Sequence, residues 1–137
     1  MTLVGKHGFS WPRNVENLRQ IKKLLKNKKG VYVLAHGGMP MYVGKGNIAS
    51  RVNGHAKKTS SKSRYWDHFS WFVIKKSGFE HELEVILLRT LPFYVRSLNR
   101  QTGSLTRKER VRPNNKQPDL VPLPKLGRKK KRRAKKR

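Results

Sequence analysis

The chain has 137 residues, 35% of them hydrophobic, and a net charge of +27 from 34 basic and 7 acidic side chains. This length suffices for one domain with a modest core, and the charge favours nucleic acid as partner over an anionic membrane surface. No apolar run approaches the ~20 residues needed to span a bilayer, the first residues lack the apolar core of a signal peptide, and absent cysteine excludes disulfides and thiolate metal sites. We therefore expect an intracellular protein, cytoplasmic or nucleoid-associated, or nuclear in a eukaryote.

The first predicted elements are a helix and a hairpin. Residues 14–27 repeat apolar side chains at helical spacing, and Asn14 can cap the helix at its start. Residues 30–35 and 41–44 are rich in β-branched and aromatic side chains, with the glycine-containing turn "HGGMP" between them. This pattern predicts two antiparallel strands.

A helix, a strand and a helix are predicted next. Residues 47–58 can form a helix that starts at Asn47, residues 67–74 read as an aromatic strand, and residues 79–91 form a helix that Pro92 stops. The order helix, strand, strand, helix, strand, helix predicts an α+β fold, in which helices flank a small antiparallel sheet of about three strands.

The C-terminal region differs in composition from the rest. Residues 107–137 carry 15 basic and 2 acidic side chains, and their proline-containing first part predicts an extended linker. Nine of the last ten residues are basic, so we expect a disordered tail that tethers the protein to nucleic acid. Three regions are therefore expected: an N-terminal helical segment over 1–29, a core over 30–106 and the linker with its tail over 107–137. The tail residues expected to contact phosphates include Arg128, Lys129, Lys130, Lys131, Arg132 and Arg133.

Four side chains of the hairpin and the following helix can converge. Neighbouring strands would bring the phenols of Tyr32 and Tyr42 to one face, and Arg51 and His55 are four residues apart on one helix face. An arginine fork matches phosphate oxygens, and a phenol or an imidazole can take a proton from water. This set suits phosphodiester chemistry.

The last predicted helix supplies a candidate metal ligand. Glu84 interrupts the apolar stripe that includes Leu87 and Leu91, and a carboxylate in such a place needs a cation. Glu80, one turn earlier, lies nearer the exposed end. Carboxylate oxygen suits magnesium, which often uses one or two protein carboxylates and completes its shell with water and phosphate.

The segment from residue 30 to about 103 resembles the GIY-YIG nuclease family. "GVY" and "YVG", which ends at Gly44, are similar to the two signature triplets, with valine where isoleucine is usual. The resemblance implies metal-dependent hydrolysis of the nucleic-acid backbone, with one Mg²⁺ or Mn²⁺ ion, and does not choose the substrate. We expect DNA as the favoured substrate, with RNA left open. The positions that match the family's site are Tyr32, Tyr42, Arg51 and His55, with Glu84 as the metal ligand and Asn99 in support.

The expected mechanism is one-metal hydrolysis. Arg51 would hold the phosphate, and Tyr32 would activate water with help from Tyr42 or His55. A phenol has a reference pKa near ~10, so Tyr32 needs nearby positive charge to act as a base near neutral pH, and Arg51, the metal ion and the basic body could supply it. Lys45, directly after "YVG", could contact a phosphate or be an ordinary surface lysine. The alternative is a ribosome- or chromatin-associated protein that binds nucleic acid on the same scaffold without cutting it.

Overall fold

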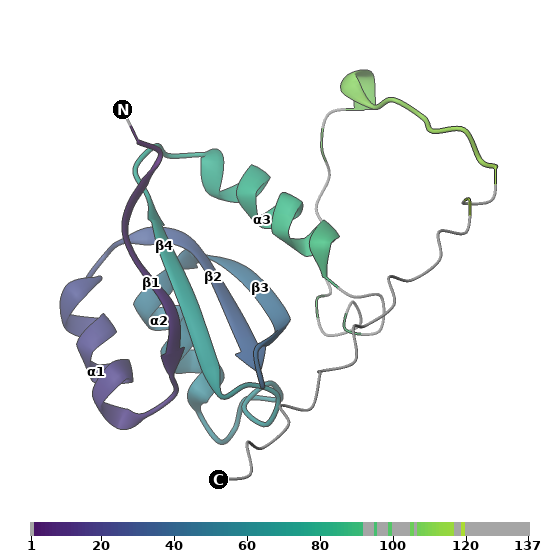
Figure 1. The fold of residues 1–137 in the computed structure, drawn as a ribbon. Coiled ribbons are helices and arrows are strands. Elements are labelled where there is room, and N and C mark those ends of the chain that lie inside the picture. Colours follow the sequence, from purple (N-terminus) through teal and green to yellow (C-terminus); the bar gives the residue numbers. More distant parts are fainter. Residues whose placement is uncertain are drawn as a thin grey trace, which may run out of the picture.

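The structure, a computed structural model, describes residues 2–91, 95, 99, 105, 107–116 and 119. A four-stranded sheet in the order β1-β4-β2-β3 forms its centre, and every neighbouring pair of strands is antiparallel (Figure 1). The predicted α+β class is thereby confirmed. The elements are β1 (Val4–Pro12), α1 (Val15–Leu24), β2 (Lys29–His36), β3 (Met39–Asn47), α2 (Ile48–Ala56), β4 (His68–Ile74), α3 (Phe79–Thr90) and the short 3₁₀ helix η2 (Arg107–Glu109).

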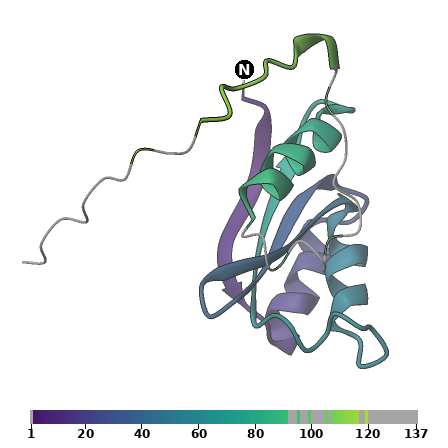
Figure 2. The ribbon, with the colours of Figure 1, turned by 90° about the vertical axis from the view of Figure 1, so that its right-hand side faces the viewer.

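Helices cover both faces of the sheet because successive strand residues point to opposite sides. Tyr32 and Leu34 of β2 face a core shared with α1 and α2, whereas Val31 of the same strand faces the core under α3. Figure 1 shows α1 and α3 on opposite sides of the strands, and Figure 2 views the molecule from the side of α3. A site at the edge of this sheet can therefore receive side chains from both layers.

The fourth strand, β1, corrects two expectations. We expected about three strands and an N-terminal helical segment over residues 1–29, but residues 4–12 pair with β4, with irregular register on either side of His7 and Gly8. Phe9 on this edge strand is 80% exposed, and β1 contributes Trp11 to the core between the sheet and α1. The N-terminal segment is therefore part of the sheet as well as a helical layer.

The predicted helix starts are confirmed. The side chain of Asn14 accepts a hydrogen bond from Asn17 N at 2.8 Å, and that of Asn47 accepts one from Ser50 N at 3.2 Å. Such caps satisfy backbone donors that a helix leaves unpaired in its first turn. Because Asn47 is also the last residue of β3, α2 starts where β3 ends, which fixes α2 against the hairpin.

In the part of the chain that the structure describes, no helix combines the length and the apolar character needed to cross a membrane. Within the segment predicted to be an extended linker, residues 107–109 form η2 and residues 110–116 have no regular structure. The basic tail over residues 128–137 lies outside the described residues.

Candidate active site

The β2–β3 hairpin brings the two predicted tyrosines to one face of the sheet. Tyr32 lies opposite Gly44 and Leu34 lies opposite Tyr42, so the tyrosines are diagonal neighbours. Their ring centroids are 6.2 Å apart. The sequence pattern predicted this arrangement, which follows from the two-residue period of a strand.

The glycines of the two triplets are required by close approaches in the sheet. A Cβ atom on Gly44 would lie under 3.0 Å from Cζ and Oη of Tyr32 and 2.9 Å from its Cε1. A Cβ atom on Gly30 would collide with the backbone oxygen of Phe72 and lie 2.9 Å from Cδ1 of Ile48. Glycine at position 44 thus makes room for the phenol of Tyr32, and glycine at position 30 lets β2, β4 and α2 pack together.

Helix α2 presents Arg51 and His55 to the tyrosines. Tyr32 Oη and His55 Nε2 are 2.8 Å apart, a hydrogen bond between side chains from the sheet and the helix. The ring of His55 also lies edge-on to Tyr42, with centroids 5.0 Å apart. The predicted convergence of two phenols and an imidazole is therefore present in the structure.

The pKa values of this pair fix the direction of the hydrogen bond. Burial, followed by the positive charges of Lys62 and Arg51, lowers the pKa of His55 from 6.5 to about 4, so its imidazole is neutral near pH 7. Burial, followed by Tyr42, raises the pKa of Tyr32 far above its ordinary value, so this phenol keeps its proton. Tyr32 therefore donates to Nε2 of His55, which leaves the histidine proton on Nδ1.

The protein's own charges do not lower the pKa of the Tyr32 phenol. We expected that Arg51 could supply the positive charge that lowers it, and Arg51 does act in that direction. Tyr32 is only 1% exposed, however, and burial disfavours the phenolate more than Arg51 favours it. Near pH 7 the proton of the pair therefore stays on Tyr32, and the neutral imidazole of His55 is the member that is present in its proton-accepting form.

Glu84 approaches the same region from the opposite layer. It lies on α3 among the buried side chains Val85 and Leu88, and it is 7% exposed although it is charged in its ordinary state. Burial raises the pKa of its carboxyl group, against the opposing effects of Lys45 and His81. Among the described residues Glu84 forms no ion pair and no side-chain hydrogen bond. The carboxylate of Glu84 is therefore buried, as the sequence predicted, and it is free to bind a cation.

Lys45 of β3 lies beside the carboxylate and has a partner that the sequence did not suggest. Its Nζ donates to Nδ1 of His81 at 2.8 Å, one helical turn before Glu84. The histidines other than His55 show no metal-ligand spacing, so no sequence signal pointed to His81. This contact holds the lysine at the edge of the site.

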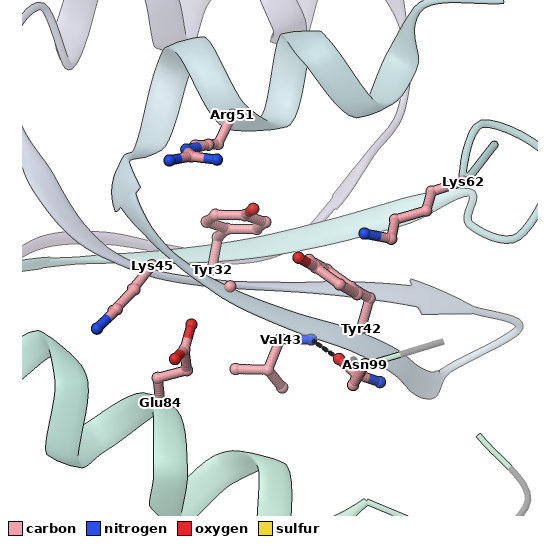
Figure 3. A pocket seen from close by; sticks show the side chains of 9 residues that line it. Tyr32, Tyr42, Val43, Lys45, Arg51, Lys62, Glu84 and Asn99 are labelled. Carbon is pink, nitrogen blue, oxygen red and sulfur yellow. Dashed lines mark hydrogen bonds between the residues drawn. The ribbon is translucent and has the colours of Figure 1, made fainter. Parts of the chain in front are cut away.

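A pocket of about 300 Å³ joins these groups around the free edge of β3. In Figure 3, Arg51 enters from α2 above the ring of Tyr32, Glu84 enters from α3 below, and Lys62 reaches in from the segment after α2. The side chains that line the pocket are Tyr32, Tyr42, Val43, Gly44, Lys45, Arg51, Lys62, Glu84 and Asn99. His55 does not line the pocket itself but is hydrogen-bonded to Tyr32, which does.

Asn99 closes the wall of the pocket next to β3. Its Oδ1 accepts from Val43 N at 3.0 Å, and its Nδ2 donates to the carbonyls of Met41 at 3.0 Å and Val95 at 3.2 Å. The amide thus pairs with the outer backbone groups of the edge strand. Asn99 holds the strand that carries Tyr42 and Lys45, which is a supporting position and not a reacting one.

The site has room and ligand chemistry for one hard divalent cation. No group of three or more histidine, cysteine, aspartate or glutamate side chains gathers among the described residues, so they build no all-protein cage. A buried, unpaired carboxylate facing a cavity does fit magnesium, which can bind one carboxylate and take its other ligands from water and phosphate. Glu84 is the residue that would hold it.

Comparison with known proteins yields a likeness in structure only. No family model matches the sequence, and no curated protein matches it significantly. The chain is similar to the GIY-YIG N-terminal endonuclease domain of UvrC from Thermotoga maritima bound to magnesium, with 22% identity and a TM-score of 0.46 over 56% of this chain and 91% of that one. A point mutant of that domain, bound to its catalytic divalent cation, matches with the same identity and TM-score over 56% and 90%.

These solved domains carry the name of the family that the triplets of this chain resemble. The identity is low and the superposition is partial.

Proposed function

We propose that the protein is a metal-dependent endonuclease that hydrolyses phosphodiester bonds of nucleic acid, with DNA as the favoured substrate. The observation that carries the proposal is the single pocket in which Tyr32, Arg51 and Glu84 meet from three elements. Such hydrolysis needs a cation that binds phosphate, groups that transfer a proton, and a carboxylate that holds a metal ion.

The residues divide the work by charge. Arg51 would bind the non-bridging oxygens of the scissile phosphate and stabilise the charge that develops there. Lys45, which lines the pocket together with Glu84, would hold a phosphate oxygen at the other side of the pocket. Magnesium or manganese held by Glu84 would polarise the phosphate and stabilise the leaving oxygen.

Proton transfer would run through the Tyr32–His55 hydrogen bond. Tyr32 is protonated and already donates to a neutral imidazole at 2.8 Å. As the attacking water gives its proton to Oη of Tyr32, the tyrosine proton would pass to Nε2 of His55. The phenol would thus never exist as a free anion in its buried position. Tyr42, whose ring contacts both partners, would orient them.

The experiment is cleavage of labelled single-stranded, duplex and branched DNA, and of RNA, with and without magnesium. Arg51→Ala and Glu84→Ala should each abolish cleavage and leave binding largely intact. Matched controls are Arg19→Ala on the exposed face of α1 and Glu82→Gln on the exposed face of α3, which should cut as the wild type does.

Two results would contradict the proposal. Wild-type rates in both Arg51→Ala and Glu84→Ala would place the site elsewhere. Binding of these substrates without cleavage under any divalent ion would favour the non-catalytic nucleic-acid-binding protein instead.

A further inference from the structure

The segment between α2 and β4, residues 57–67, is a basic loop with a defined shape. Backbone hydrogen bonds of 2.9 to 3.2 Å close successive turns along it, and Asp67 N donates to Ala35 O of β2 at 2.9 Å. Asp67 at its end is its sole acidic residue. The basic residues of the loop are Lys57, Lys58, Lys62 and Arg64.

One arginine from a distant part of the chain holds this loop. Arg13, between β1 and α1, donates from its guanidinium to the carbonyls of Ala56 at 3.1 Å, Trp66 at 3.2 Å and Ser63. The same guanidinium lies over the ring of Trp66, 4.3 Å from its centroid. A rigid fork that bonds the carbonyl at the end of α2 and two carbonyls of the loop fixes the course of that loop before any ligand binds.

The braced loop brings a cation and an aromatic ring to the mouth of the pocket. Lys62 lines the pocket and places its Nζ 4.0 Å from the ring centroid of Tyr42. Lys62 and Tyr42 also line a small neighbouring cavity together with Tyr65, whose side chain is 45% exposed. A positive charge and an exposed aromatic ring therefore lie next to each other beside the proposed cleavage site.

We propose that residues 57–67 form a strand-binding loop, which holds the phosphate next to the scissile one on Lys62 and an unpaired base on Tyr65. This inference rests on the proposed function, because the strand would run from the loop into the pocket of Glu84 and Arg51. Lys62 would thus bind the strand beside the cut and would not touch the reacting atoms, since its Nζ lies over the ring of Tyr42.

The aromatic ring limits the class of substrate. Nucleic-acid bases stack on exposed aromatic side chains in a sequence-independent way, and this requires a base that is not already stacked within a duplex. A nucleotide that is unpaired beside the cut meets this condition in a single strand, an overhang or a branch point. The loop therefore selects such substrates over a continuous duplex.

The first test is binding measured by fluorescence anisotropy without divalent ions, so that cleavage does not enter the result. Lys62→Met should weaken binding roughly 5-fold at moderate salt and lower the log–log salt slope by about 1, the value for one lost phosphate contact. Lys62→Arg should restore both. Lys76→Met, which removes the same charge from an exposed site at the opposite end of β4, should lower affinity less.

The second test compares Tyr65→Leu with Tyr65→Phe on an overhang and on a blunt duplex, each made of DNA and of RNA. Loss of stacking should weaken binding of the overhang by roughly 5- to 100-fold, and the phenylalanine variant should bind as the wild type does. The affinity for the blunt duplex should stay unchanged. Equal losses on both substrates, or none on the overhang, would overturn the assignment of Tyr65.

The brace is tested by Arg13→Lys, which keeps the charge but cannot reach three carbonyls. Amide hydrogen exchange within residues 57–65 should increase, and binding should weaken while far-ultraviolet circular dichroism stays unchanged. If Lys62→Met and Arg13→Lys bind with wild-type affinity and salt slope, the loop proposal is wrong even if the protein cuts. If they bind more weakly while no cleavage occurs, the loop proposal stands and the nuclease proposal fails.

Discussion

Replacing Gly44 by alanine would add one methyl group where the structure leaves no space for it. The new Cβ would lie 2.9 Å from Cε1 of Tyr32 and closer still to Cζ and Oη, whereas ordinary van der Waals contact begins at 3.4 Å. The phenol must therefore shift by at least about 0.5 Å, away from its 2.8 Å hydrogen bond to His55. Misplacement on this scale should lower the cleavage rate by roughly 10- to 100-fold.

Stability should fall as well, because overpacking of a buried side chain costs about 1–3 kcal/mol. For a domain of this size each kcal/mol lowers Tm by roughly 4–8 °C. The matched control is Gly54→Ala in α2, where a Cβ would meet no atom within 4 Å. Alanine favours a helix over glycine by about 1 kcal/mol, so this variant should unfold at a higher temperature and cut normally.

Thermal unfolding and single-turnover cleavage of the two variants are the assays. The same chemical change is thus expected to act in opposite directions at two positions ten residues apart. If Gly44→Ala cuts and unfolds as the wild type does, the position of the Tyr32 phenol in this site is wrong.

Three further predictions follow from the site and the tail. Glu84→Gln should lower cleavage by at least about 100-fold, whereas Glu80→Gln should cut normally. Glu84→Gln should also raise Tm, because burial raises the pKa of this carboxyl and its charge therefore destabilises the fold near pH 7. A larger loss of cleavage in Glu80→Gln would mean that Glu80, and not Glu84, is the metal ligand. The cleavage rate should stay level from pH 8 to 5 and fall below pH 5, and NMR should show His55 titrating near 4. Because folding disfavours the charged form of His55, the stability that its neutral form contributes is complete above pH 6.5 and should be lost as the pH falls towards 4. Deleting residues 127–137 should flatten the salt dependence of binding and leave the rate at saturating substrate unchanged; an unchanged salt slope would mean that the tail does not bind.

The sequence predicted the parts of the fold that carry strong local signals. The caps at Asn14 and Asn47, the hairpin turn and the burial of Glu84 all follow from side-chain chemistry within one or two turns of chain. The two tyrosines could be placed on one face because strand geometry leaves a single alternation. These local signals were enough to predict which side chains line most of the pocket.

Strand β1 carried no such signal. Residues 4–12 contain two glycines and a proline, and their apolar side chains do not alternate. The segment is extended because it pairs with β4, where His7 lies opposite Phe72 and Trp11 opposite Phe69 across an irregular register. A long-range contact of this kind decides the local structure and leaves no local trace in the sequence.

The roles of Arg13 and Lys62 were hidden for a different reason. In a chain with 34 basic residues, nothing in the sequence separates an arginine that braces a loop from one that is solvated. Likewise, the raised pKa of Tyr32 depends on how deeply the fold buries its ring, which the spacing of motifs does not show.

Asn99 has a consequence for how molecules of this protein meet one another. An open strand at the rim of a sheet is a template on which a strand of a second molecule can add, and β3 is such a rim. The amide of Asn99 occupies Val43 N and the carbonyl of Met41, the groups that an incoming strand would use. One side chain therefore blocks strand addition at the mouth of the pocket, and an alanine at position 99 would leave these two backbone groups free to pair with a strand of a second molecule.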